Sequence, residues 1–223
     1  GAVGSPPARD KSGITWDYAR NRLVVFGGGD STGSILGDTW EWDPVTNTWA
    51  DVTPTGTSPL PRRWCALAYD QVNSKVLLFG GLDANGSTHL NDTWQFDGLT
   101  WTQLNPTGPV PAVRRQHALV ERPDVADIIL CGGQEAGGAG MLSDTWSWDG
   151  SNWNQINTTN VPAGKVAMDA AYDQIRQRIV IASGMPGPTG SISEFDSRTN
   201  DWVIRPLDPG IYKVTRYFMA YVP

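Results

Sequence analysis

The chain has 223 residues, of which 39% are apolar and 18% charged, and a formal net charge of −6 at pH 7. This size and apolar content suffice for a large core, while 25 glycines and 16 prolines indicate many turns and short strands. The acidic balance argues against general nucleic-acid binding, and the longest apolar runs are far shorter than the ~20 residues that cross a bilayer, so we expect a soluble protein.

The first of four similar units is expected at residues 9–58. An apolar run from Leu23 to Phe26 ends in Gly27-Gly28, which is typical of a buried strand that stops at glycine. Aromatic residues alternate with polar ones from Asp38 to Asp43, and a turn then leads to Trp49. Together with an earlier strand that ends ten residues before the glycine pair, this pattern predicts four antiparallel strands.

The same signals return in units at 59–110, 111–161 and 162–208. The glycine pair recurs after 53 and then 52 residues, and a constant period indicates one repeated supersecondary unit. The fourth unit departs most, because Ser193 stands where the others have tryptophan. Residues 212–222 match the first strand of a fifth unit. The later pairs are Gly80-Gly81, Gly132-Gly133 and Ser183-Gly184.

A double glycine after the second strand and spaced aromatics in the third and fourth strands resemble the kelch repeat, across essentially the whole chain. The resemblance implies an all-β fold: one kelch-type β-propeller domain, of the galactose oxidase central-domain-like superfamily, over residues 1–223. It would hold four complete four-stranded blades plus one extra C-terminal first strand. Most tryptophans fall at repeat positions and are expected between blades. Trp64 has no aromatic equivalent, so we expect it to touch a ligand.

Four units fall short of the five to seven blades with which kelch propellers usually close. The first eight residues correspond to a connecting loop, and the segment from Arg216 to Val222 is a strand without partners. Because an unpaired strand invites pairing with another chain, we expect self-association, with two copies completing a ring of about eight blades or exchanging first strands. A fragment of a longer propeller is the alternative.

Basic residues gather where the first strand of each unit begins, on the face that also carries the long loops. Guanidinium groups in a ring suit an anionic small molecule, an acidic peptide or a glycan, and we predict a binding module without membrane or nucleic-acid partners. The alternative for each arginine is an ion pair with a loop aspartate or packing between blades. The expected binding residues are Arg62, Arg63, Trp64, Arg114, Arg115, Lys165, Arg216 and Tyr217.

A second hypothesis is a promiscuous ester or phosphoester hydrolase. Cys65 and His117 occupy equivalent positions on neighbouring innermost strands, and we expect them to face a common channel. A thiolate flanked by an imidazole, Arg63 and Arg115 would have a lowered pKa and could act as a nucleophile, with His117 as the base. The alternative is a buried thiol and a core histidine.

No cofactor is implied. His89 and His117 are the two histidines, so the copper site of galactose oxidase cannot be carried over. Calcium held by loop carboxylates such as Asp30 and Asp83 is left open, although no ordered spacing supports it. Two cysteines are too few for a disulfide scaffold or a zinc site. The compartment is undefined, with a secreted or periplasmic location slightly favoured over a cytoplasmic one.

Overall fold

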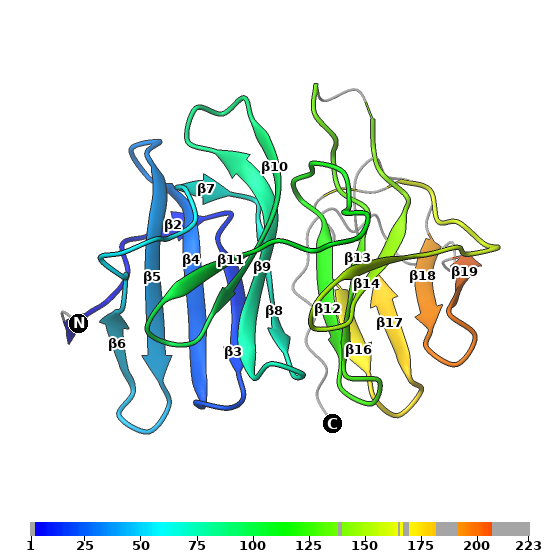
Figure 1. Ribbon diagram of the computed structural model, residues 1–223, viewed down its shortest axis with the longest axis horizontal. Helices are drawn as coiled ribbons and strands as arrows, with labels where there is room; N and C mark the ends of the chain where they lie inside the picture. Colours follow the sequence, from blue (N-terminus) through cyan, green and yellow to red (C-terminus); the bar gives the residue numbers. More distant parts are fainter. Residues whose placement is uncertain (1–2, 138–139, 165, 167–169, 182–190, 207–223) are drawn as a thin grey trace.

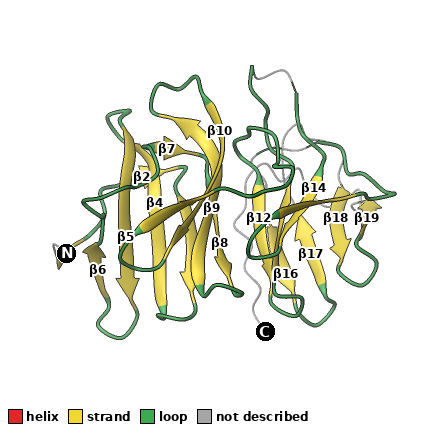
Figure 2. Cartoon of the chain, in the orientation of Figure 1, coloured by secondary structure: helices red, strands yellow, loops and turns green. Residues whose placement is uncertain are grey.

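The computed structural model describes residues 3–137, 140–164, 166, 170–181 and 191–206 (Figure 1). Within these ranges the chain forms strands, turns and loops without a helix, so no helix there could span a membrane (Figure 2). The prediction of an all-β fold is confirmed. The proposed strand at 212–222 lies outside the described residues.

The strands form four antiparallel sheets, here called sheets I to IV, each lying within one predicted unit apart from an added N-terminal strand. Sheet I contains β1 (Val3–Gly4), β2 (Arg9–Asp10), β3 (Gly13–Asp17), β4 (Arg22–Asp30), β5 (Ile35–Asp43) and β6 (Thr48–Asp51). Sheet II contains β7 (Arg62–Arg63), β8 (Ala66–Asp70), β9 (Lys75–Asp83), β10 (His89–Phe96) and β11 (Trp101–Leu104). Sheet III contains β12 (Ala118–Arg122), β13 (Asp127–Cys131), β14 (Thr145–Trp148) and β15 (Trp153–Ile156). Sheet IV contains β16 (Ala170–Asp173), β17 (Arg178–Ile181), β18 (Ser191–Asp196) and β19 (Asp201–Pro206).

One expectation about the N-terminus is wrong. Residues before Arg9 were expected to form only a connecting loop, but β1 adds an outer strand to sheet I by pairing with β6. Val3 lies opposite Ala50, and Gly4 lies opposite Trp49. β6 would otherwise be the outer edge of its sheet, so this pairing satisfies its free backbone hydrogen-bonding groups. The repeat pattern does not predict β1, because β1 lies outside the repeated unit.

The innermost strands of successive sheets lie side by side, in the order β3, β8, β12 and β16 (Figure 1). Backbone hydrogen bonds tie the segments that precede three of them. The Trp64 amide donates to the Lys11 carbonyl at 2.8 Å, and the Gln116 amide donates to the Trp64 carbonyl at 3.1 Å. The sheets therefore follow one another around a shared axis, as in a kelch β-propeller.

Tryptophans on the outermost strands join each sheet to the one before it. The Trp101 indole donates to the Thr39 hydroxyl at 2.9 Å, and Trp202 donates to Thr145 at 2.9 Å. The middle junction repeats this contact. All three indoles are almost completely buried. The expectation that repeat tryptophans pack between blades is confirmed for these junctions, where an apolar ring also has a partner for its polar N–H.

The glycine pairs allow a neighbouring sheet to approach the backbone closely. Gly27 and Gly80 both have φ near +63°, a left-handed conformation that glycine adopts without strain. A Cβ atom on Gly80 would lie 2.9 Å from the Arg114 carbonyl oxygen of sheet III. That same carbonyl accepts the Gly81 amide at 2.9 Å. The glycines are thus needed where consecutive sheets touch.

A buried arginine anchors the start of each of the first three sheets. Its guanidinium pairs with an aspartate in, or directly before, the third strand of the repeat and donates to the carbonyl of the first paired glycine. A tryptophan two residues after the aspartate donates to the same carboxylate at 2.7 Å. We call these groups the Arg–Asp–Trp triads. They are Arg9–Asp38–Trp40, Arg62–Asp92–Trp94 and Arg114–Asp144–Trp146.

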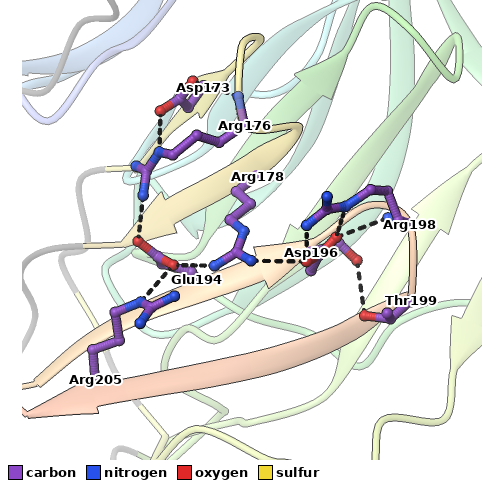
Figure 3. Close-up of polar contacts among 8 residues, drawn as sticks. All are labelled: Asp173, Arg176, Arg178, Glu194, Asp196, Arg198, Thr199 and Arg205. Atoms are coloured by element: carbon purple, nitrogen blue, oxygen red, sulfur yellow. Dashed lines mark hydrogen bonds and ion pairs between the residues drawn. The ribbon is translucent and has the colours of Figure 1, made fainter.

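Sheet IV has serines, Ser191 and Ser193, at the aspartate and tryptophan positions of the triad. Carboxylates on its outward face are held instead by arginines from neighbouring strands and turns (Figure 3). Glu194 pairs with Arg176 at 2.9 Å and with Arg178 at 2.6 Å. Burial alone would raise the pKa of Glu194, but hydrogen bonds from Arg205, Arg178 and Arg176 lower it to about 2. This face therefore carries a fixed ionic network.

The triads generate a prediction about stability. In Asp92→Ala, the Arg62 guanidinium stays buried without its carboxylate, so the free energy of unfolding should fall by about 3 kcal/mol. Asp10→Ala is the matched control, because Asp10 pairs with Lys11 at the surface, and it should cost less than about 1 kcal/mol. Urea denaturation measures both. Equal losses would contradict a structural role for the triads.

Candidate functional site

Three cations from different sheets converge on one indole where the innermost strands begin. The Arg63 guanidinium carbon lies 4.3 Å from the Trp64 ring centroid, and that of Arg115 lies 4.6 Å from it. The Lys11 ammonium lies 5.3 Å from the same centroid. We call Lys11, Arg63, Trp64 and Arg115 the basic cluster. Distances of this size are favourable for cation–π attraction.

The backbone at Trp64 explains why the cluster can form. Trp64 has φ of 58°, as do the equivalent residues Lys11 and Gln116 within a degree. This left-handed conformation costs energy for a side chain as large as tryptophan. The cost is offset by the two hydrogen bonds that join Lys11, Trp64 and Gln116 across the sheets. The ring thereby lies within reach of arginines from adjacent sheets.

The arginines of the basic cluster lack carboxylate partners within the described part of the chain. Arg115 donates to the Gln134 side-chain oxygen at 2.6 and 3.0 Å, which leaves its charge uncompensated. The buried Nε of Arg63 has no hydrogen-bond partner there. Burial, followed by the charge of Arg63, lowers the pKa of Arg115. Two neighbouring cations that repel one another in this way favour a bound anion.

His89 lies at the edge of this positive field. Burial, followed by the charge of Arg115, lowers the pKa of its imidazole. Neither ring nitrogen has a hydrogen-bond partner among the described residues. Both nitrogens are buried, so the neutral imidazole lies beside the arginines without facing solvent. No sequence signal places His89 near the site, because it follows a loop and matches no repeat position.

Adjacent arginines in the predicted binding set have different environments. Arg62 and Arg114 were expected to bind ligand, but both side chains are 0% exposed and are bound within the triads. We therefore assign them a structural role. Arg63 and Arg115 follow them directly and belong to the basic cluster. The alternation of side chains along an extended segment could have separated the two sets. Lys165, Arg216 and Tyr217 lie outside the described residues.

Cys65 and His117 do not form the expected pair in a common channel. Cys65 packs with the core between sheets I and II, and a Cβ atom on Gly13 of sheet I would lie 3.3 Å from its sulfur. The His117 ring instead lies edge-on to Phe79 of sheet II, with centroids 5.5 Å apart. Each side chain thus points toward the preceding sheet, so the two enter different interiors.

Their electrostatics are also opposite to those required for catalysis. Burial raises the pKa of the Cys65 thiol to about 11, against the opposing effect of the Arg62 charge. Burial, followed by the charge of Arg114, lowers the pKa of His117 to about 3. The prediction of a thiolate at Cys65 is wrong, because the nearby arginine charge does not outweigh the effect of burial on the pKa of the thiol. A protonated thiol and a buried neutral imidazole give no basis for the hydrolase hypothesis.

The loop carboxylates considered for calcium are used within their own turns. The Asp30 side chain accepts hydrogen bonds from the backbone amides of Thr32 and Ser34 at 2.8 and 2.9 Å. Asp83 accepts from the Thr88 amide at 3.1 Å. Among the residues described, no three metal-ligating side chains come together. The carboxylates account for the loop shape without an ion.

Among known protein families, the KLHDC2/KLHL20/DRC7 Kelch-repeats domain matches residues 2–160 of this chain. Kelch domain-containing protein 2 of Bos taurus is 31% identical over 182 residues, which are 68% of this chain and 42% of that protein. Kelch domain-containing protein 3 of Homo sapiens is 34% identical over 95 residues, 41% of this chain and 24% of that protein.

A third relative has a different printed name. Acyl-CoA-binding domain-containing protein 4 of Arabidopsis thaliana is 30% identical over 132 residues, which cover 58% of this chain and 19% of that protein. In each of the three relatives, the match therefore spans less than half of the protein's length. Sheets I to III, with all three triads and the basic cluster, lie inside the region matched by the family model.

Burial of His117 predicts a pH dependence of stability. Its folded pKa of about 3 lies below the ~6.5 of an exposed histidine, so the unfolded chain takes up the proton first as the pH falls. The stability that neutral His117 contributes is complete above pH 6.5 and is lost toward pH 3. Between pH 7 and 4, wild type should lose on the order of 1–3 kcal/mol more than His117→Gln in urea unfolding. Parallel losses in the two proteins would contradict the buried neutral state.

Proposed function

The chain belongs to the kelch-repeat family, a family of protein-interaction modules, and we propose that it binds an acidic segment of a partner protein at the basic cluster. The observation that carries this proposal is the pair of arginines, Arg63 and Arg115, that both lie over the Trp64 ring with no carboxylate partner in the described chain. Equivalent arginines one residue earlier are all paired with aspartates.

An acidic side chain fits the chemistry of this cluster. A guanidinium presents its donors in a planar fork that matches the two oxygens of a carboxylate. The indole face keeps both guanidinium groups in place, which reduces the side-chain entropy lost on binding. An uncharged glycan would leave the unpaired charges uncompensated, so we favour the peptide over the glycan.

The charge of the whole chain makes this cluster selective. With a net charge of −6, the protein as a whole does not attract anions at long range, so binding of an acidic segment depends on the local field of the basic cluster. Binding should therefore depend on the position of the acidic residues within a segment and weaken as salt is added.

A peptide titration tests the proposal. A fluorescent hexaglutamate peptide should bind wild type, and the double substitution Arg63→Ala with Arg115→Ala should weaken binding at least tenfold, since each charge-assisted hydrogen bond contributes about 1.5–3 kcal/mol. Lys75→Ala is the control for loss of a positive charge elsewhere and is compared with each single arginine variant, because Lys75 lies at the start of β9 and Arg63 pairs near its end. Hexaglutamine should not bind. Unchanged affinity in the double variant, or equal binding of hexaglutamine, would contradict the proposal.

We also propose self-association, with sheet IV of one copy packed on sheet I of another. In sheet I, Asp17, Arg20 and Glu41 form an ionic group that packs against sheet II. The Arg20 guanidinium carbon lies 5.4 Å from the Phe96 ring centroid of that sheet. Sheet IV repeats this group as Asp173, Arg176 and Glu194 (Figure 3). Arg20 is 28% exposed, whereas Arg176 is 50% exposed, because no described sheet covers it.

The complementary surface lies on sheet I. Trp42 occupies the position of Phe96, and Trp49 occupies the position of Trp101, but both are only half-buried. The Trp49 indole has no preceding threonine of the kind that Trp101 uses. The aromatic residues of sheet I in a second copy would therefore meet the Arg176 group as Phe96 meets Arg20.

Sedimentation velocity tests this contact. Wild type should show a dimer whose dissociation constant rises at least tenfold in Arg176→Glu, because the reversed charge would face Glu194 and the aromatic rings. Arg198→Glu is the matched control, since this exposed arginine pairs with Asp196 at the other end of the network. A monomer at all concentrations, or equal effects of the two substitutions, would contradict the proposed contact.

A further inference from the structure

A cavity of about 370 Å³ lies between the innermost strands of all four sheets. Apolar side chains at one level of its wall come from each sheet in turn: Ile14, Leu67, Leu119 and Ala170. Glu121 is the one carboxylate among the described residues that line it, and no lysine, arginine or histidine does so. The described wall therefore combines this apolar level with the hydroxyl and amide groups of Thr15, Tyr18, Tyr172 and Gln174 and one carboxylate.

This cavity is distinct from the basic cluster. Arg115 precedes β12, whereas Glu121 lies near the far end of that strand. With a rise of about 3.3 Å per residue in an extended strand, the six residues between them span at most roughly 20 Å, so the two lie at different levels of the channel. A ligand of the cavity therefore need not touch the peptide site, and the inference does not depend on the proposed function.

Glu121 replaces an aromatic residue of the repeat. It lies opposite Ile128 in its sheet, as Tyr69 lies opposite Val76 and Tyr172 opposite Ile179. The fold therefore accepts an aromatic side chain at this position. Sheet III has Glu121 there instead, and its carboxylate lines the cavity. No ion pair within the described residues compensates this charge.

The carboxylate has unused capacity for hydrogen bonds. Its Oε2 accepts the Tyr69 amide at 2.9 Å, and its Oε1 accepts the Tyr18 hydroxyl at 3.3 Å. An ionised carboxylate can accept about four hydrogen bonds, so each oxygen can take one more. Burial raises the pKa of Glu121 in opposition to these two hydrogen bonds. A cation in the cavity would offset that desolvation.

The wall supplies further acceptors. The strands β3, β8, β12 and β16 each pair with one neighbour, which leaves their other edges unpaired along the cavity. Such an edge presents backbone carbonyl oxygens as well as amides. An ammonium group has three donors and no acceptor, so it matches one carboxylate together with carbonyl oxygens. An anion would be repelled by Glu121.

We propose that this cavity binds a small hydrophobic amine, with its ammonium group on Glu121 and its apolar body between Ile14, Leu67 and Leu119. The contact is reversible binding with no covalent step. Because the four sheets each contribute to the wall, such a ligand would bridge the innermost strands of the propeller.

Benzylamine and benzyl alcohol test the proposal in isothermal titrations of the full chain. Benzylamine should bind saturably at millimolar concentrations, and benzyl alcohol, which has the same ring without the charge, should bind at least tenfold more weakly. Glu121→Gln should reduce benzylamine affinity at least tenfold. Arg63→Ala with Arg115→Ala should leave it unchanged, which separates this site from the peptide site.

Glu121→Tyr provides a second variant that the fold should tolerate, because tyrosine occupies the equivalent positions in sheets II and IV. It should also lose benzylamine binding, while near-ultraviolet circular dichroism confirms the native fold. The proposal is overturned if wild type shows no saturable binding of benzylamine, if benzyl alcohol binds equally well, or if both Glu121 variants retain wild-type affinity.

Discussion

A buried guanidinium can remain charged inside a protein only where carboxylate and carbonyl oxygens surround it. The Arg–Asp–Trp triads meet that requirement three times, and in doing so they fix where each innermost strand begins. Arg114 illustrates the coupling, because its side chain binds Asp144 in its own sheet while its backbone carbonyl accepts the Gly81 amide of the preceding sheet. Anchoring within a sheet and spacing between sheets are therefore set by the same residue.

This anchoring assigns different roles to neighbouring basic residues. Once Arg62 is directed into the sheet, extended geometry directs Arg63 to the channel, and the same holds for Arg114 and Arg115. Within the described residues, the guanidinium groups of Arg63 and Arg115 then meet around Trp64 without a carboxylate partner. At the other end of the same strands, the channel carries a carboxylate. The propeller thus presents opposite charges at its two ends, which suits two chemically different ligands.

Repeats are well predicted from sequence because their signals recur in phase. The glycine pairs and the tryptophans of the outer strands located the strands and the junctions, and the structure confirms both. The basic site was located only as a group, since a run of basic residues does not show which side chains find aspartates far along the chain. Cys65 and His117 were correctly placed at one level, but their rotation toward the preceding sheet and the cost of burial decided their chemistry. Such effects depend on packing between units and have no local signal.

Arg62 is assigned a structural role, and Arg63 is not. The most direct test is to replace each with lysine and compare the free energies of unfolding. Lysine keeps the charge but cannot reproduce the planar fork that holds Asp92 and the Gly80 carbonyl. Arg62→Lys should lose about 2 kcal/mol, as expected for weakened buried charge-assisted bonds, whereas Arg63→Lys should stay within about 0.5 kcal/mol of wild type. Equal losses, or a larger loss at Arg63, would contradict the account.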